Sequence, residues 1–358
     1  MSLVSLDRYA FINAKLRSRI GSMLETAQIE QLMKSQTLEE LLHALRGTPY
    51  EPLLEIYDES GDVQRLEAWL FARNVALHQE VAKFMKGIHG EAVLAMTRKL
   101  EVENLKGVIR LWFSNTVKHQ NIDYRFGYLY QDEIVSSVDW TQIVNASGYD
   151  GILEAVEGSP YASAVSSFSP EQVAQEGLFG LETALDRTWI GELHRVVAQL
   201  PPKDRSLIEQ VLHRDADLKN IINLVRFGWM YQLPQDQLRT LMLEGSSLVE
   251  TKEFEAYLET PPSARSPEKL VAKRFPDLSK LLRDSGKSTP EEQTRLVEWY
   301  LFSVRKQSFH AMLQGDPFNF GTILSYFFLE ERQDAIIRIL INGIHYGWES
   351  QEIREFVL

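Results

Sequence analysis

Apolar residues recur along this chain at the spacing of an α-helix. Residues 38–45 place leucines at positions i, i+3, i+4 and i+7, and residues 105–112 and 218–225 repeat this spacing with other apolar side chains. A helix of this kind has one apolar face, which it must bury against another element. Strand-like segments are sparse, and residues 134–138 are the best candidate. The pattern predicts an all-α chain in which helices pack on helices.

Capping residues and helix breakers divide this pattern into separate helices. Thr37 precedes an apolar run and is followed by Glu40 three positions later, which is the spacing of a capping box. Ser169 and Thr289 each stand directly before a proline, so we expect them to be N-caps with proline in the first turn. Gly47-Thr48-Pro49 is expected to end one helix and begin another.

Three landmarks occur in the same order more than once. Residues 45–50 (LRGTPY) resemble residues 156–161 (VEGSPY), and residues 258–261 resemble them as a reduced third copy without the glycine. A second landmark follows at residues 66–70, 181–185 and 297–301. A third, which closes each copy, covers residues 103–110, 216–223 and 331–338.

The order of the landmarks predicts three helical repeat units, covering residues 1–125, 126–235 and 236–358. Each unit is large enough to hold a small core of its own and too long for the common solenoid repeats. The alternative is that amphipathic helices resemble one another without being repeats. The third unit is the least regular copy.

The distribution of charge argues against nucleic-acid binding. The formal net charge is -12, and the acidic excess lies in the last two thirds of the chain, since residues 1–125 carry 16 basic and 16 acidic groups. Binding to phosphates needs a basic surface, which this balance does not offer. No stretch approaches the roughly 18 consecutive apolar residues of a membrane-spanning helix, and we expect no transmembrane segment.

The chain offers little of the chemistry on which catalysis depends. It has no cysteine, which removes disulfides, thiolate metal sites and cysteine nucleophiles. No two of its eight histidines lie four residues apart, so we expect no helical zinc motif, no metal and no cofactor. Residues 286–289 (GKST) resemble part of a phosphate-binding loop, but Leu281 stands where the first glycine is needed. We interpret them as a loop between helices and predict a non-catalytic protein.

Polar residues of the closing landmark are the candidate functional residues. Residues of one helix that lie seven apart are near the same face, as Glu103 and Arg110 are, and Glu331 and Arg338. They either lie on solvated outer faces, or form hydrogen bonds within each bundle, or line an inner surface shared by the three units. The full set of candidates is Glu103, Asn104, Arg110, Asp217, Lys219, Glu331 and Arg338.

The ordered motifs resemble the C subunit of archaeal and bacterial A/V-type ATPases, which is named the d subunit in vacuolar enzymes. Residues 9–19 (YAFINAKLRSR) are similar to that family's Tyr-x-Tyr/Leu-x-Asn-Ala-Arg-x-Arg-x-Arg start, and Glu103 to Arg110 resemble its Asp/Glu-x-x-Asn-Leu-x-x-x-x-Arg helix. Asp217 to Ile221 resemble the second copy of this helix, and residues 326–343 its Tyr…Glu-x-Glu…Arg close. The resemblance covers essentially the whole chain.

This resemblance implies a funnel of three helical bundle domains related by a pseudo-threefold axis. The family's role implies a non-catalytic rotor adaptor of the central stalk, which couples ATP turnover to proton or sodium transport. It implies the D and F proteins of the shaft and the membrane proteolipid (c) ring as partners, and the a/I protein of the membrane stator as a further contact. The place implied is the cytoplasmic face of the membrane.

Two other functions also agree with the residues. A cytosolic helical scaffold unrelated to ATPases accounts for the repeats and the acidity equally well. A nucleotide-handling enzyme that uses residues 286–289 is the third hypothesis, and it predicts that Lys287→Ala abolishes nucleotide binding.

Overall fold

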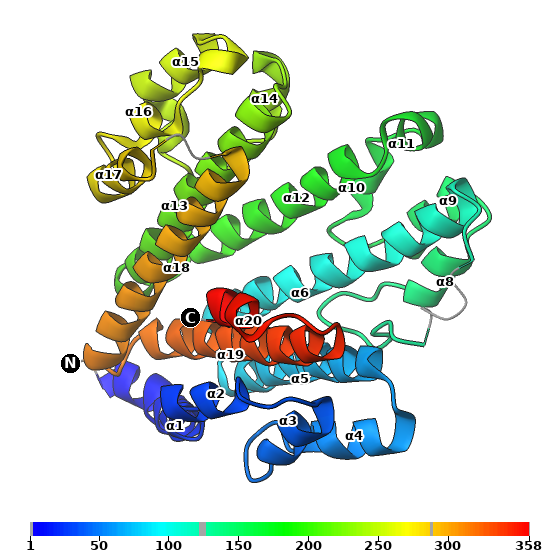
Figure 1. Ribbon diagram of the computed structural model, residues 1–358, viewed down its shortest axis with the longest axis vertical. Coiled ribbons are helices and arrows are strands. Elements are labelled where there is room, and N and C mark those ends of the chain that lie inside the picture. Colours follow the sequence, from blue (N-terminus) through cyan, green and yellow to red (C-terminus); the bar gives the residue numbers. More distant parts are fainter. Residues whose placement is uncertain (1–2, 122–126, 287–288, 358) are drawn as a thin grey trace. The chain divides into compact units, whose positions relative to one another are not determined.

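The computed structural model describes residues 3–121, 127–286 and 289–357, and all regular elements in these ranges are helices (Figure 1). The prediction of an all-α chain is confirmed. Residues 134–138, the strand candidate, form bends and irregular backbone. By its internal contacts the chain divides into two compact units, one of residues 1–189 and 317–358 and the other of residues 190–316. The three-unit division predicted from the repeats stays a prediction.

Unit 1 contains both ends of the chain. Its helices are α1 (Leu3–Gly21), α2 (Thr26–Leu32), α3 (Leu38–Ala44), α4 (Pro52–Ser60), α5 (Val63–Phe84), α6 (Ile88–Trp112) with the π-helical η1 (Phe113–Val117), α8 (Trp140–Asn145), α9 (Tyr149–Ala155), α10 (Ala162–Ser166), α11 (Pro170–Glu176), most of α12 (Phe179–Val197), α19 (Gly321–His345) and α20 (Ser350–Val357). Within this unit, α19 packs against α1, α5 and α20 (Figure 1).

Unit 2 is continuous in sequence. It contains the last turns of α12, then α13 (Pro202–Asn223), η2 (Leu224–Met230), α14 (Gln235–Thr240), η3 (Leu248–Glu250), α15 (Lys252–Glu259), η4 (Pro262–Ala264), α16 (Pro267–Val271), α17 (Pro276–Asp284) and α18 (Pro290–Gln314). The long helices α13 and α18 pack against each other, and α16 packs against α17.

The predicted helix starts are confirmed in detail. The Thr37 side chain accepts a hydrogen bond from the N–H of Glu40 at the start of α3. Ser169 and Thr289 each form a capping box at the start of α11 and α18, with proline in the first turn. Each of these caps satisfies backbone N–H groups that have no partner within the helix. The short-range sequence signals therefore fix these three helix ends.

The LRGTPY and VEGSPY landmarks form the same turn. The glycine has φ +74° in the first copy and +75° in the second, a left-handed conformation that glycine adopts without strain. The hydroxyls of Thr48 and Ser159 each donate to the carbonyl three residues back and accept from the N–H two residues on. The tyrosine whose backbone N–H donates this bond, Tyr50 or Tyr161, is fully buried. These two copies are therefore alike in structure as well as in sequence.

Three hydrophobic clusters are built to one plan. Each joins one long helix, a group of short helices and the first turns of a second long helix. In unit 1, one cluster joins α6 to α8, α9, α10 and the start of α12, and in unit 2 another joins α13 to α15, α16, α17 and α18. The remaining cluster joins α19 to α2, α3, α4 and the start of α5, so the end of the chain packs on its beginning.

Candidate functional site

Buried polar pairs recur in α6, α13 and α19, the long helices that contain the third landmark of each copy. In each, an acidic residue is followed three positions later by an amide residue, so that both lie on one helix face. All six side chains are at least nine-tenths buried. The pairs are Glu101 and Asn104 in α6, Asp217 and Asn220 in α13, and Glu330 and Gln333 in α19.

The amides hold the loops that lead into the short helices, and we call Asn104, Asn220 and Gln333 the loop clamps. Gln333 donates to the carbonyl of Leu24 (2.8 Å) and accepts from the N–H of the same residue (3.1 Å). Asn220 binds Leu243 in the same way, at 3.2 Å and 2.8 Å. Each loop thereby gains two partners for backbone groups that would otherwise be buried without any.

In the pair of α6, both side chains, Glu101 and Asn104, form hydrogen bonds to the loop. The Asn104 amide donates to the carbonyl of Tyr130 at 3.1 Å. One carboxylate oxygen of Glu101 accepts from the N–H groups of Val135 and Ser136, at 2.7 Å and 2.6 Å. Hydrogen bonds to a charged acceptor are about twice as strong as neutral ones. The loop of residues 130–136 is therefore fixed to α6 along its length.

The Asp217 carboxylate accepts hydrogen bonds from the loop before α15 and from an arginine. Its Oδ1 accepts from the Ser246 hydroxyl (2.7 Å) and the Leu248 N–H (3.0 Å). Its Oδ2 lies 2.5 Å from Nε of Arg274. The carboxylate is fully buried, and a buried charge of this kind is tolerated when it is paired and hydrogen-bonded.

Glu330 belongs to a larger buried network in unit 1. Arg73 of α5 contacts Glu330 through Nη2 (2.8 Å) and Asp334 through Nη1 (3.0 Å). The Tyr50 hydroxyl also donates to Asp334 at 2.8 Å, and the Arg73 guanidinium lies over the Tyr50 ring. Burial raises the pKa of Asp334 to about 6, against the opposing effect of Arg73. One cation thus holds two acids of α19 against the N-terminal helices.

The predicted candidates do not share one environment. Asn104 and Asp217 are buried and bind loops, as described above. Glu103 and Glu331 are exposed, yet the structure brings them to one lysine: Nζ of Lys99 lies 3.9 Å from Glu103 and 2.5 Å from Glu331. This links α6 to α19 within unit 1.

The other candidates lie at or near the surface. Arg110 forms a two-pronged ion pair with Glu182 of α12, with both distances 2.6 Å, and its hydrogen bond to this glutamate raises its pKa. Lys219 is half-buried and Arg338 is exposed. Because Glu103 contacts Lys99 while Arg110 contacts Glu182, the seven-residue spacing does not bring these two candidates to one partner.

Four of the six residues in the buried pairs were not among the predicted candidates. Asn104 and Asp217 were predicted, whereas Glu101, Asn220, Glu330 and Gln333 were missed. The signal that could have found them is the spacing of an acid and an amide three positions apart. It aligns Asn104 with Asn220 and Gln333, whereas the landmarks align Asn104 with Asp217. If residues with the same role are aligned, the second copy therefore lies three residues further along the chain than the landmarks place it.

The remaining motifs are the fragment of residues 286–289 and the histidines. In the fragment of residues 286–289, Gly286 ends the turn after α17 and Thr289 caps α18, while Lys287 and Ser288 lie outside the described residues. No cluster of three or more metal-ligand side chains occurs in the described ranges. His78 is buried and stacks on Phe327, with ring centroids 3.8 Å apart, and burial lowers its pKa to about 4. No helix among the described residues is long and apolar enough to cross a membrane.

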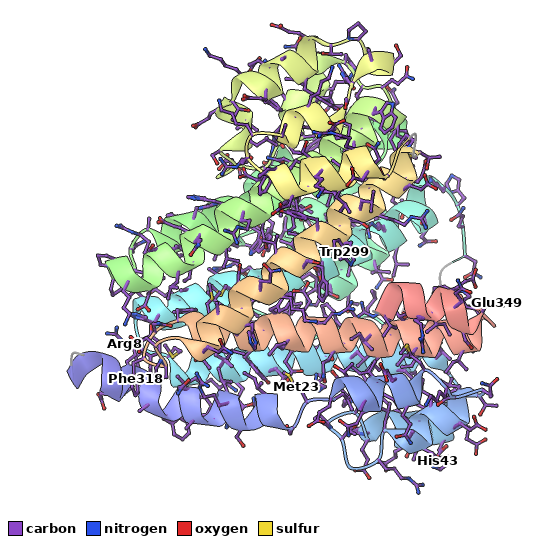
Figure 2. All side chains as sticks on the ribbon, turned by 60° about the vertical axis from the view of Figure 1, so that its left-hand side comes forward. Arg8, Met23, His43, Trp299, Phe318 and Glu349 are labelled. Atoms are coloured by element: carbon purple, nitrogen blue, oxygen red, sulfur yellow. The ribbon has the colours of Figure 1, made fainter. Side chains whose placement is uncertain are left out.

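Large apolar side chains are exposed on both units, and Trp299 of α18 is one of those labelled in Figure 2. Arg8 and Phe318 lie near the start of α19 in that view, whereas Glu349 lies beyond its end (Figure 2). The exposed side chains are Phe11, Phe84, Phe179, Met230, Tyr231, Trp299, Tyr346 and Trp348.

The arrangement ties long helices into stiff bodies. Buried acids and amides fix the loops, and apolar clusters of interlocking helices fill the space between them. Close-packed interiors resist compression and transmit strain.

Comparison with known proteins gives a match over nearly the whole chain. The model of the ATP synthase (C/AC39) subunit family matches residues 12–356. The C subunit of the A-type ATP synthase of Methanobrevibacter smithii is 19% identical over 99% of this chain and 89% of its own length. Its namesakes from Methanosphaera stadtmanae and Thermococcus gammatolerans are 23% and 22% identical, each over 98% of this chain and 88% and 89% of their own lengths. The chain belongs to the ATP synthase (C/AC39) subunit family.

Proposed function

We propose that this protein is a non-catalytic rotor adaptor in the central stalk of a V/A-type ATPase. It would link the D and F proteins of the shaft to the membrane proteolipid ring and so couple ATP turnover to proton or sodium transport. The observation that carries this proposal is the family match over residues 12–356, together with relatives named as C subunits of A-type ATP synthases that align along 98–99% of the chain.

The packing supports a coupling role. A torque coupler needs stiff elements, and the loop clamps and buried acids fix the loops of three clusters to long helices. In the proposed arrangement the three repeat units of the sequence form a funnel, which receives the shaft at one end and rests on the ring at the cytoplasmic face of the membrane. The a/I protein of the membrane stator is the further contact that the proposal includes.

The first test is copurification of a tagged chain after mild detergent extraction of membranes. The proposal expects the D and F proteins and the proteolipid to be recovered with it in fixed ratio. An untagged extract serves as the background control. Recovery of the chain without any of these proteins, from a complex that is otherwise intact, contradicts the proposal and favours a scaffold unrelated to ATPases.

The second test measures coupling in membrane vesicles from a strain that lacks the gene. We expect ATP hydrolysis by the catalytic head to persist and ATP-driven ion uptake to be lost. Complementation with the wild-type gene should restore uptake, and so should Arg239→Gln, which removes an exposed ion pair with Glu255. Ion uptake at the wild-type level without the gene overturns the proposed role.

A further inference from the structure

A polar pocket in unit 2 is lined by a buried cation that has no acidic partner among the described residues. The pocket has a volume of about 330 Å³, within the range of sites that hold small ligands or single side chains. It lies among the η2, η4, α16, α17 and α18 segments. Its polar and aromatic lining includes Trp229, Arg265, Ser266, Glu268, Arg283 and Gln293.

Arg265 is the unusual member of this lining. Among the described residues it is the one buried lysine or arginine, with an exposed fraction of 6%. Its four hydrogen bonds all go to backbone carbonyls, those of Gly228, Leu233, Leu258 and Thr260. A guanidinium has five N–H groups, so one remains.

Two of the other charged groups described above have partners of opposite charge. Arg73 contacts two carboxylates, and buried Asp217 contacts Arg274. Carbonyl dipoles orient Arg265 but do not neutralise it, and a buried charge without a counter-charge is unfavourable. An anion in the pocket would remove this cost.

The charges around the pocket favour an acidic ligand. Among the described lining residues, Glu268 pairs with Arg283 at 2.8 Å, so two cations and one anion leave a charge of +1. This lies on a chain whose formal net charge is -12. Trp229, whose indole N–H is a hydrogen-bond donor, also lines the pocket.

The lining also contains a buried hydrogen-bond acceptor that a ligand could pair with a donor. Gln293 is nine-tenths buried, and its side-chain oxygen has no hydrogen-bond partner in the part of the chain that the structure describes. Two backbone N–H groups at the rim are already used, since those of Ser285 and Gly286 donate to the carbonyls of Leu281 and Arg283. A phosphate cradle requires several free N–H groups, whereas one carboxylate requires few. A peptide supplies both a carboxylate and an N–H donor.

We propose that this pocket binds an acidic side chain on a peptide segment of a protein partner. The carboxylate lies against Arg265 and Arg283, the backbone N–H of the segment approaches Gln293, and an apolar neighbour packs on Trp229. The site goes beyond the stalk role proposed above, and it can be tested on the purified chain whether or not that role holds.

The test uses two acetylated, amidated tetrapeptides, Ala-Glu-Leu-Asp and its neutral isostere Ala-Gln-Leu-Asn. Binding is followed by the tryptophan indole resonances of the ¹⁵N-labelled full-length protein at low salt, and Trp229→Phe identifies the resonance at the pocket. We expect this resonance to shift saturably with the acidic peptide and to stay in place with the neutral one. No shift at millimolar acidic peptide, with the protein folded, overturns the proposal.

Two substitutions should move the affinity in opposite directions. Arg283→Glu should weaken acidic-peptide binding at least tenfold, because it reverses a charge at the pocket. Glu268→Gln should strengthen binding about threefold, because it releases Arg283 from its own acid. General damage to the fold does not produce an increase, so the opposite signs separate binding from folding. A decrease in both variants contradicts the site.

Matched controls come from a second exposed ion pair of unit 2, Arg239 with Glu255. Arg239→Glu and Glu255→Gln should leave the affinity for the acidic peptide unchanged. Inorganic phosphate and AMP are titrated in parallel. If either one shifts the Trp229 resonance at lower concentration than the peptide does, the pocket is a phosphate site and the peptide proposal is wrong.

Discussion

Two of the long helices fasten their loops with the same two hydrogen bonds but across very different lengths of chain. Asn220 of α13 reaches Leu243, 23 residues away, whereas Gln333 of α19 reaches Leu24, 309 residues away. The entropy of closing a loop grows with the logarithm of its length, and this ratio corresponds to about 2 kcal/mol. The longer closure therefore needs stronger support.

The support for the longer closure lies beside the clamp. In unit 1, Arg73 is 12% exposed and holds both Glu330 and Asp334, to which Tyr50 adds a hydrogen bond. In unit 2 the corresponding ion pair joins Asp217 to Arg274, whose side chain is 39% exposed. The same kind of helical cluster can thus be completed by a nearby loop, as around α13, or by the two ends of the chain, as around α19. The cluster around α19 contains more buried charge.

Arg73→Met should have the largest effect on this comparison. It leaves two acids buried without their cation, and breaking a buried ion pair costs about 3–5 kcal/mol. We expect amide hydrogen exchange to accelerate throughout α2, α3, α4 and α19, while α13 keeps its protection. Arg239→Met, which breaks an exposed pair, is the control and should change neither region. Equal loss of protection in α13 would show that the two closures are not independent.

Substitution of the loop clamps tests whether they contribute equally to stability at the short and the long sequence separation. Gln333→Leu and Asn220→Leu each leave two backbone groups of a loop without partners, at about 1–3 kcal/mol per buried group. We expect the amide of Leu24 to lose protection in the first variant and that of Leu243 in the second. Asn104→Leu removes one hydrogen bond and should have about half the effect on urea unfolding. An effect of Asn104→Leu as large as that of the other two contradicts this account.

The pH dependence of stability should separate two buried groups of unit 1. Asp334 has a folded pKa of about 6, above its ordinary 3.8, so its contribution to stability falls as pH rises from about 4 to 6. His78 has a folded pKa of about 4, below its ordinary 6.5, so its contribution rises between about pH 4 and 6.5. Each effect is on the order of 3 kcal/mol, and in the wild type they oppose each other.

Single variants should reveal the two slopes. In Asp334→Asn the stability of unit 1 should rise with pH over this window, and in His78→Phe, which keeps a ring beside Phe327, it should fall. Urea unfolding at half-unit steps of pH measures both. Slopes of the same sign in the two variants would refute the assignment. The charged groups that face these two residues are Arg73, Lys99, Glu330, Glu331 and Arg338.

The smallest effect is expected at the surface. Arg110→Met removes the two-pronged pair with Glu182, but the arginine side chain is 59% exposed, and exposed pairs contribute about 0.5 kcal/mol. A double-mutant cycle with Glu182→Gln isolates this coupling free energy, which should fall further in high salt. A coupling above about 2 kcal/mol would mean that the pair belongs with the buried network instead.

Local signals in the sequence predicted much of the helical structure. The caps at Thr37, Ser169 and Thr289 are confirmed, because a cap depends on residues within one turn of it. The candidate functional residues differ in their burial. Asn104 and Asp217 are buried and bind loops, while Glu103, Arg110, Glu331 and Arg338 are exposed, because a seven-residue spacing alone does not say which face of a helix is covered.

The sequence by itself determined the all-α class, the helix starts after Thr37, Ser169 and Thr289, the recurring turns and the family resemblance, since each depends on short-range order or on ordered motifs. Only the tertiary structure decided that α19 packs on α3, that Arg73 joins Glu330 to Asp334, and that Arg265 lies buried with no acid beside it among the described residues. These contacts join residues far apart in the chain. Burial and partner choice depend on which helices meet, and the spacing of residues within one helix carries no record of that.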